Sequence, residues 1–522
     1  MRKTKRLLAV VLTLCMVLAL AACGGKSDDK KGGEAAGSSH DREVVYGSTS
    51  MIVNFNVKYM TTAADIAAAD QVYDTLVRKV NGELVGYIAE DWEISEDGKD
   101  YTFHLNKDAV FSNGDPITAE DVKFSIEYIR DECSQWSWLH KELADIEIVD
   151  DHTCIFHYNV PDASLISGIT YVQYGGVFSK KAYEEYGEDY GTSVDKIVSS
   201  GPYVATNWED NVSVSFEARD DYYGKEVDLK KLKYVAIADM NAAVVALQTG
   251  ELDLYFNPVS GVALDNLKAA DNVAISEALT CRNESIYMNC ETGLFTDVRM
   301  RKAVAYAINK EEALEVCGSG QGQIVTYPCD LGDKVIGNPD FTPSTTYEYD
   351  VEKAKALVKE CGNVGASCTI KSYNTEPYAT LSVWLQGALN EIGLDAKVDT
   401  MERSAFIEQC TNGEVEICPF SWSNNSFDFG AGAAIYMNSA NIPVSGNYGR
   451  YSNPEADKLV ALGNSSTDEE VRKSYYKDLM ELYMEDVPSV AMYAVINAIA
   501  HSDQLTMEDA GLEQMALVHW AD

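Results

Sequence analysis

The sequence predicts an α/β fold built from at least two lobes. Its 522 residues are 46% hydrophobic and 10% aromatic, which is enough apolar material for more than one core. Segments of period two, typical of strands, alternate along the chain with segments of helical period. No pattern repeats at about 20 to 50 residues, which excludes a solenoid or a propeller. No polar linker divides the body, so we expect several chain crossings between the lobes.

The charge of the chain excludes several classes of partner. There are 42 basic and 82 acidic residues, and the formal net charge is −40. Such a surface repels phosphate groups, so we expect no nucleic-acid partner and no binding to anionic lipid heads. Solubility is the simplest reason for this charge.

The N-terminus has the pattern of an export signal. Four basic residues precede the apolar run Leu7–Ala22, which is too short to span a bilayer and is typical of a signal peptide over residues 1–22. The run ends in Leu-Ala-Ala-Cys-Gly, which resembles the bacterial lipobox and implies lipidation of Cys23. Residues 23–43, rich in Gly, Ser and Lys, then form a flexible tether. We predict an exported protein at the outer face of the cytoplasmic membrane, in contact with that membrane only through this lipid.

The first half of the body contains clear strand and helix signals. Strands at Trp92–Ile94 and Tyr101–Leu105 flank an Asp-Gly turn and predict a hairpin. Thr118 and Asp121 have the spacing of a capping box and predict the start of a helix. The other elements predicted here are a strand at 212–217 and a helix at 240–249 that ends at Gly250.

The second half has the same mixture. Four helices are predicted from apolar positions on one face, at 300–308, at 351–358 after an Asp350 cap, at 381–392 before Gly393, and at 471–482 before Pro488.

Twelve cysteines include Cys15 in the signal and Cys23 at the lipobox, which leaves ten in the body. No Cys-x-x-Cys motif occurs, so a zinc knuckle or a redox dithiol is not expected. An exported chain can oxidise its thiols, and the pairing is left open.

A series of short motifs runs in a fixed order along the body. They are Tyr73–Val77, Ala89–Trp92, Tyr101–Phe124, Ser200–Tyr203, Arg219–Tyr223, Gly250–Asp253, Phe295–Asn309, Tyr451–Pro454 and Pro488–Val490. Together they cover about residues 44 to 500 and resemble the bacterial extracellular solute-binding proteins of family 5, the oligopeptide, dipeptide and nickel receptors of ABC importers. Asn106 departs from the signature, where a basic residue is usual.

The resemblance implies a two-lobe clamshell of the periplasmic-binding-protein type (type II), with an extra subdomain in lobe I. Carried onto this chain, lobe I is 44–285 with its subdomain at about 79–199, lobe II is 286–485, and 486–522 returns to lobe I. It also implies a monomer that holds a small solute between its lobes and delivers it to an ABC permease. The partner ATPase subunits hydrolyse ATP, so no cofactor is expected on this chain.

Enzyme chemistry is not expected. His152 and His157 flank a strand at an odd spacing, which puts them on opposite faces and makes them poor metal co-ligands. The chain has neither His-Glu-x-x-His nor Gly-x-Ser-x-Gly. We therefore predict no catalytic residues and no metal site.

The segment from Pro419 to Asp428 contains the main candidate ligand-binding residues. In peptide receptors of the family the matching stretch is Trp-x-x-Asp, and its Asp pairs with the ammonium of the peptide. Here Trp422 is followed by Asn425 at that place, and an amide cannot make the charge-assisted bond of a carboxylate. Either Asp428 takes the ammonium or the ligand has none there. The candidates in this segment are Trp422, Asn424, Asn425, Phe427 and Asp428.

Two other segments bear on the ligand. Asn54, Phe55 and Asn56, after the first predicted strand, are candidates for the opposite wall of the site. Dipeptide receptors hold the ligand carboxylate with an Arg in the segment that matches Thr369–Tyr378, where this chain has only Lys371 as a basic residue. This favours a longer peptide over a strict dipeptide.

An oligopeptide is thus the first ligand hypothesis. The alternative is an oligosaccharide, for which rings would stack on sugars and amides would bind hydroxyls. A third reading is a surface adhesin or chaperone-like lipoprotein that imports nothing.

Overall fold

The computed structural model describes residues 41–60, 62–339, 341–423, 427–442 and 446–521. The predicted signal peptide, Cys23 and nearly all of the predicted tether lie outside the described residues, as do Asn424 and Asn425.

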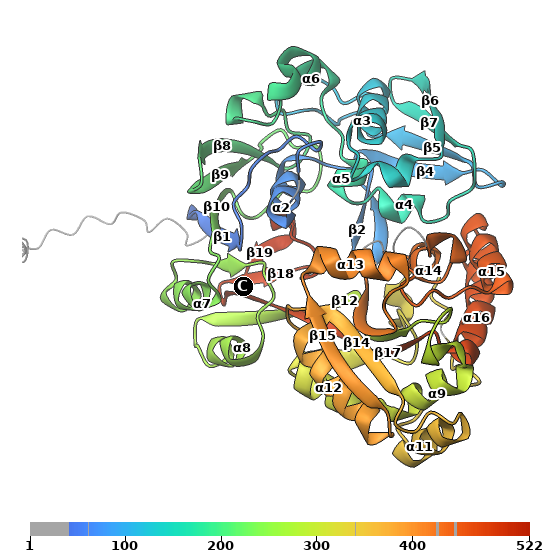
Figure 1. Ribbon diagram of the computed structural model, residues 1–522. Helices are drawn as coiled ribbons and strands as arrows, with labels where there is room; N and C mark the ends of the chain where they lie inside the picture. The colour runs from blue at the N-terminus through green and yellow to red at the C-terminus, as the bar shows by residue number, and fades with distance from the viewer. Residues whose placement is uncertain (1–40, 61, 340, 424–426, 443–445, 522) are drawn as a thin grey trace, which may run out of the picture. The chain divides into compact units, whose positions relative to one another are not determined.

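A large mixed sheet organises the described part of the chain (Figure 1). Ten of its strands follow one another in space as β15 (Asp395–Met401), β14 (Ser367–Tyr373), β16 (Ile417–Ser423), β12 (Val273–Met288), β17 (Ser489–Ser502), β11 (Leu254–Tyr255), β1 (Val44–Ser48), β10 (Lys231–Ala236), β9 (Ser213–Ala218) and β8 (Tyr203–Glu209), and β13 (Gly322–Ile324) pairs with β17. The long strands β12 and β17 pair antiparallel from Val273↔Ser502 to Tyr287↔Ser489, with two irregularities in register. The alternating apolar strand predicted at 212–217 is β9.

A second sheet has four antiparallel strands in the order β4 (Ala89–Ile94), β5 (Asp100–Leu105), β7 (Thr153–Tyr158) and β6 (Leu143–Asp150). The predicted hairpin is confirmed, with Ile94 opposite Tyr101 and Trp92 opposite Phe103. Two-stranded sheets are formed by β2 (Val77–Val80) with β3 (Glu83–Gly86) and by β18 (Leu505–Met507) with β19 (Val518–Trp520).

Three predicted capping residues lie at the helix ends where they are expected. Thr118 forms the expected capping box at the start of α3 (Ala119–Glu132). Gly250 ends α7 (Met240–Thr249) in the left-handed conformation, at φ 75°. Asp350 accepts a hydrogen bond from Lys353 N at the start of α11 (Val351–Glu360). The other predicted helices are α9 (Val298–Ala307), α12 (Tyr378–Glu391) and α16 (Glu469–Asp486).

Three further groups of helices complete the described chain. Those before β12 are α2 (Ala63–Val72), α4 (Leu165–Gly168), α5 (Val172–Gly175), α6 (Lys180–Tyr186) and α8 (Gly261–Lys268). Those after it are α10 (Lys310–Gly318), α13 (Arg403–Asn412), α14 (Phe429–Tyr436) and α15 (Pro454–Ser465). Short 3-10 turns include η2 (Ser137–His140).

The buried apolar side chains gather in two large clusters that divide the sequence. One takes its residues from 281–494. The other takes them from 44–256 and again from 499–518, so the end of the chain packs with its beginning. A smaller third cluster lies around α7, α8 and the neighbouring parts of β11 and β17.

Two further observations concern membrane-spanning helices and the cysteines of the described chain. No helix in it has both the length and the apolar composition needed to span a bilayer. All ten cysteines of the body are free thiols in this structure, seven of them buried and three half-buried.

Candidate functional site

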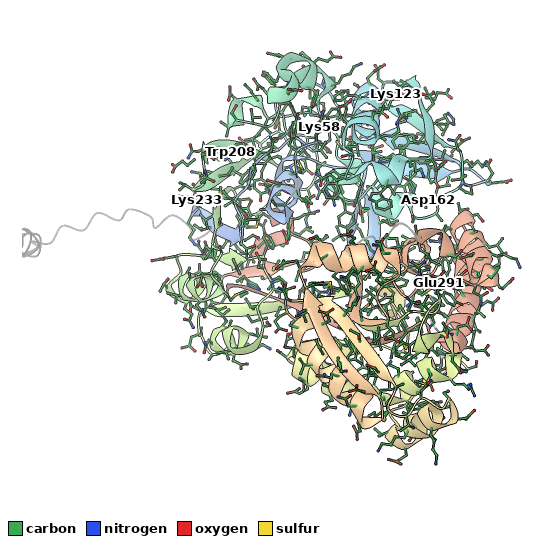
Figure 2. The ribbon with its side chains drawn as sticks, in the orientation of Figure 1. Lys58, Lys123, Asp162, Trp208, Lys233 and Glu291 are labelled. Carbon is green, nitrogen blue, oxygen red and sulfur yellow. The ribbon has the colours of Figure 1, made fainter. Side chains whose placement is uncertain are left out.

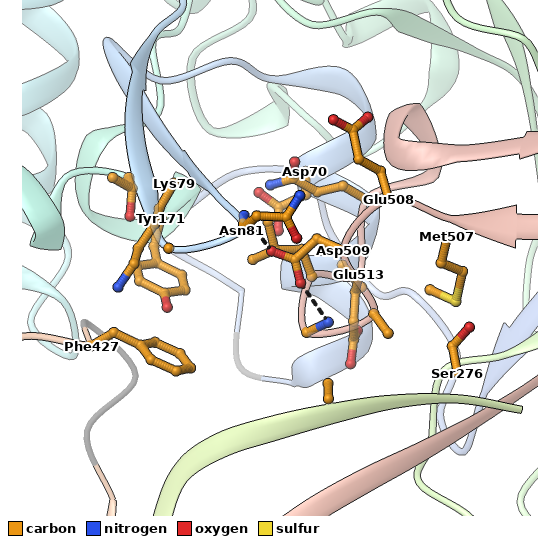
Figure 3. A pocket seen from close by; sticks show the side chains of 18 of the residues that line it. Asp70, Lys79, Asn81, Tyr171, Ser276, Phe427, Met507, Glu508, Asp509 and Glu513 are labelled. Atoms are coloured by element: carbon orange, nitrogen blue, oxygen red, sulfur yellow. Dashed lines mark hydrogen bonds between the residues drawn. The ribbon is translucent and has the colours of Figure 1, made fainter. Parts of the chain in front are cut away.

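A pocket of about 530 Å³ is the main concavity of interest (Figure 3). This volume lies in the range of small-molecule sites. Its walls come from α2, the β2–β3 hairpin, the start of α5, the first half of β12, Phe427 after β16, and the chain from Met507 to Gln514. The pocket therefore joins segments that are more than 400 residues apart in the sequence.

A tight hairpin turn and one carboxylate shape the upper part of the pocket. Asn81 and Gly82 join β2 to β3 with φ values of 52° and 88°, which are typical of the mirror-image turns that Asn-Gly favours. The Asp509 carboxylate accepts hydrogen bonds from Asn81 N at 2.9 Å and from Gly511 N at 2.8 Å. Asp509 thus ties the C-terminal segment to the hairpin (Figure 3).

The same C-terminal segment is also held by α2. The Gln71 side chain donates to Glu513 O at 2.7 Å and accepts from Met515 N at 2.9 Å. Gln71 is fully buried, so these bonds replace water that its amide has lost. This wall of the pocket is therefore built from groups already bonded to each other.

Charged groups of both signs line the pocket, five acidic and two basic. They are Asp70, Glu277, Glu508, Asp509, Glu513, Lys79 and Lys334. Burial raises the pKa of Asp70 to about 6, although the positive charge of Arg78 opposes this shift. Burial, followed by the charge of Asp70, raises the pKa of Glu513 to about 7. The negative charge of this wall therefore increases as the pH rises through neutrality.

Lys79 is the most buried of the charged groups that can donate into the pocket. The residue is 9% exposed, and its Nζ has no hydrogen-bond partner among the described residues. Nζ lies 4.4 Å from the centre of the Phe427 ring, a cation–π distance. Burial lowers the pKa of Lys79 to about 8, while the nearby Cys281, Asp428 and Asp509 act in the opposite direction.

Of the predicted site residues that the structure describes, Phe427 lines this pocket. Its backbone is left-handed, with φ at 52°, which is rare for an aromatic residue. Its carbonyl accepts from Ile336 N at 2.8 Å, and Ile336 O accepts from Phe429 N at 2.9 Å. These two bonds hold the residue so that its ring lies beside Lys79.

Trp422 lies in the core and away from the pocket. It is 0% exposed, and its ring stacks on Tyr436 with centroids 4.5 Å apart. The Tyr436 hydroxyl accepts from Ser423 N and donates to Ser423 O, both at 3.0 Å. Because β16 is an interior strand of the sheet and is buried on both faces, alternation along it does not bring Trp422 to a surface.

Asp428 is also buried and already has a cationic partner. One terminal nitrogen of Arg472, on α16, donates to both carboxylate oxygens at 2.7 and 2.8 Å. The same carboxylate accepts from Ala431 N at 3.0 Å and caps α14. In this structure the negative charge that the sequence offered to a ligand ammonium is neutralised inside the protein.

The other predicted wall lies at the apolar cluster of residues 44–256 and 499–518, to which Phe55 belongs. Phe55 is buried against Trp208 and Phe216, with ring centroids 5.4 and 6.2 Å apart (Trp208 is labelled in Figure 2). Asn54 accepts from Asn56 N at 2.7 Å, and the Asn56 amide donates to the Tyr183 hydroxyl at 3.2 Å. None of the three is among the residues that line the pocket.

Sequence reasoning missed most of the residues that form the pocket. Lys79, Asp70 and Glu513 carry no spacing signal, because they come from two ends of the chain that meet only in the folded state. Asn81-Gly82 is a hairpin signal that the sequence does contain, and it would have placed Lys79 two residues before a turn.

Comparison with known proteins is consistent with this architecture. Residues 83–443 match the model of the bacterial extracellular solute-binding proteins, family 5. The oligopeptide-binding protein AppA of Bacillus subtilis is 26% identical, and the alignment covers 96% of both chains. The heme-binding protein A of Haemophilus influenzae is 26% identical over 92% of this chain and 93% of its own.

A solved structure shows the same fold. The structure of HbpA2 from Haemophilus parasuis superimposes with a TM-score of 0.82 at 23% identity, over 92% of this chain and 100% of that one. These relatives are solute-binding proteins and not enzymes. The chain belongs to the bacterial extracellular solute-binding proteins of family 5.

Proposed function

We propose that this protein is the substrate receptor of an ABC importer and that its ligand is an oligopeptide. The observation that carries the proposal is the match to an oligopeptide-binding relative over nearly the whole of both chains. The pocket supports it, because side chains of both signs suit a ligand that carries an ammonium and a carboxylate. A neutral oligosaccharide would leave these charges without partners.

The proposal includes the lobes expected from the family. Lobe I is 44–285 with the return segment 486–522, its extra subdomain is about 79–199, and lobe II is 286–485. The two large apolar clusters support this division, since one draws on 281–494 and the other on 44–256 and 499–518. The four-stranded sheet β4-β5-β7-β6 falls inside the proposed subdomain.

We propose the pocket as the ligand site, with Phe427 as its aromatic contact. Asn424 and Asn425, three and two positions before it in the chain, are proposed to bind polar groups of the ligand. Trp422 and Asp428 then support the site without touching the ligand: Trp422 packs β16, and Asp428 caps α14. Asn54, Phe55 and Asn56 likewise stabilise the fold of lobe I without touching the ligand.

The experiment that tests the ligand class is a thermal-shift screen. Mixed tripeptides to pentapeptides, maltooligosaccharides and haemin are added separately at equal concentration. A ligand at about 100 times its Kd stabilises the folded state by roughly 2.7 kcal/mol, which is readily measured. Peptides are expected to raise the Tm. A rise with maltooligosaccharides or haemin alone would contradict the peptide assignment.

Anchoring by a lipid is a separate part of the proposal. The Leu-Ala-Ala-Cys-Gly run supports it, with Cys23 as the modified residue and 23–43 as the tether. Cys23→Ala is expected to leave the protein unprocessed or released from membranes, as seen by membrane fractionation and by intact mass. A diacylglyceryl mass on the N-terminus of the variant would contradict the assignment. Delivery to a permease as a monomer is likewise proposed.

A further inference from the structure

The described residues offer the Lys79 ammonium no hydrogen-bond acceptor. This ammonium can donate three hydrogen bonds, yet its Nζ is buried and has no partner among the described residues. Burying an unpaired charge is unfavourable, so such groups are normally paired in the folded state. The neighbour that it does have, the Phe427 ring, offers a cation–π contact and no hydrogen-bond acceptor.

The position of Lys79 restricts which groups can supply a hydrogen-bond acceptor to its ammonium. Lys79 projects from β2 into the same pocket whose other side carries Asp70, Asp509 and Glu513 (Figure 3). In the close-up, Lys79 lies with Tyr171 and Phe427, apart from the group of carboxylates. The Asp509 carboxylate already accepts from two backbone N–H groups. A ligand that enters the pocket can therefore bring the missing acceptor.

The charge of the pocket limits the kind of acceptor. Its lining has five carboxylates and two ammonium groups, so a free dianion such as phosphate meets net repulsion. A monoanionic carboxylate on a molecule that also carries a cationic group meets Lys79 at one side and the carboxylates at the other. Such a zwitterion is what a small peptide with free termini provides.

We propose that Lys79 is the residue that binds the carboxylate of the ligand, with the ring of Phe427 against the other side of its ammonium. This inference rests on the proposed function, because it names the carboxylate-binding group of the same site. Lys79 comes from the β2–β3 hairpin. The resemblance to dipeptide receptors instead places the carboxylate-binding group in the segment 369–378, where Lys371 is the only basic residue. In the structure the Lys371 ammonium donates to Gln409 at 2.7 Å instead.

The test combines a change in the protein with a change in the ligand. Binding of mixed tripeptides with a free C-terminus, and of the same mixture with a C-terminal amide, is measured by thermal shift and calorimetry. The proteins are the wild type, Lys79→Met and Lys334→Met, the last removing the same charge from an exposed lining residue of the same pocket. Met has nearly the shape of Lys, and circular dichroism checks that each variant is folded.

A charge-assisted contact predicts a specific pattern. In the wild type the amide should bind about tenfold to a hundredfold more weakly than the free acid, the usual range for a hydrogen bond to a charged group. Lys79→Met should lose a similar factor for the free acid and no longer distinguish it from the amide. Lys334→Met should still distinguish the two. If amidation has no effect on the wild type, or Lys79→Met keeps the distinction, Lys79 does not bind the carboxylate.

The same variants separate this inference from the proposed function. If no peptide binds but haemin, which carries carboxylates, binds to the wild type and tenfold or more weakly to Lys79→Met, the role of Lys79 stands and the peptide assignment falls. If only neutral maltooligosaccharides bind, both fall. If peptides bind without regard to their C-terminus, the peptide assignment stands and the role of Lys79 falls.

Discussion

At the scale of single residues, buried charge is what distinguishes the candidate site from its surroundings. Asp428 and Arg472 are both buried, and their ion pair joins the start of α14 to α16. Lys79, a short way from them in the fold, has no hydrogen-bond partner among the residues that the structure describes. A paired buried charge such as Asp428 with Arg472 is typical of structural support. A buried charge without a hydrogen-bond partner, such as that of Lys79 within the described chain, is typical of a group that binds a ligand.

Removing one member of the buried pair should destabilise the protein strongly. Arg472→Met leaves the Asp428 carboxylate buried without its cation, which typically costs about 3–5 kcal/mol. The double variant Arg472→Met, Asp428→Asn removes both charges and should recover much of that loss. Urea unfolding of the two variants and the wild type measures the difference. A double variant as unstable as the single one would show that the pair is not what Arg472 contributes.

Trp422 and Phe427 should differ in what their removal affects. Trp422→Ala opens a cavity in a packed core and should lower the free energy of unfolding by about 3–5 kcal/mol. Phe427→Ala removes a half-buried ring from the pocket and should change stability little, while it weakens peptide binding by about tenfold or more. Calorimetry and urea unfolding on both variants test this. If the two substitutions weakened peptide binding equally, Trp422 would be part of the ligand site.

At the scale of elements, one buried histidine links η2 to α5 and β7. His140 Nε2 lies 2.6 Å from Tyr174 O, just before the end of α5, and Nδ1 lies 2.7 Å from the Tyr158 hydroxyl on β7. A carbonyl can only accept, so Nε2 carries a proton. Burial lowers the pKa of His140 to about 4, so the ring is neutral near pH 7 and its Nδ1 then accepts from the Tyr158 hydroxyl.

The neutral His140 makes the protein sensitive to acid. In the unfolded chain its pKa is about 6.5, so the unfolded state binds the extra proton first. Its contribution to stability is complete above about pH 6.5 and is lost as the pH falls toward 4, by roughly 3 kcal/mol in total. Asp70 and Glu513, with raised pKa values, act in the opposite sense over much of this window.

The prediction is therefore made on a difference between two proteins. His140→Gln keeps a donor and an acceptor but does not titrate, so it should lose less stability than the wild type between pH 6.5 and 4. The contributions of Asp70 and Glu513 cancel in the comparison. Urea unfolding at intervals of pH measures the two curves. Parallel curves would show that His140 does not titrate on unfolding.

At the scale of the whole molecule, a body of this size holds its shape without cross-links. The ten body cysteines are free in this structure, and burial raises the pKa of several, for example Cys154 to about 12. A thiol with a raised pKa reacts slowly, because the thiolate is the nucleophile.

This predicts a simple pattern of alkylation. In the native protein, iodoacetamide should label at most Cys290, Cys317 and Cys361, the three half-buried thiols. After unfolding without reductant, all ten body cysteines should be labelled. Peptide mapping by mass spectrometry identifies each site. A cysteine that is labelled only after reduction would show a disulfide formed on export.

Much of the local structure followed from the sequence because its causes are local. The capping box at Thr118, the cap at Asp350, the stop at Gly250 and the hairpin around Asp97-Gly98 each depend on residues within a few positions of one another. The family could also be predicted, since its motifs are many and ordered.

The candidate site followed much less well, because burial and pairing depend on distant segments. Trp422 is predicted at a cleft by its motif, yet β16 lies inside the sheet and buries it. Asp428 is a predicted ligand-binding residue, yet in the structure its carboxylate binds Arg472, which lies 44 positions later in the chain. Neither partner is visible from spacing alone.

The sequence by itself determined the α/β class, the helices and strands with strong caps, and the family. Only the tertiary structure decided which charges remain unpaired. Lys79 reads as an ordinary strand lysine until β2, α2 and Met507–Gln514 come together around one pocket. The reason is physical, since the free energy of a charge depends on the water it loses and the partners it gains, and both are set by segments from opposite ends of the chain.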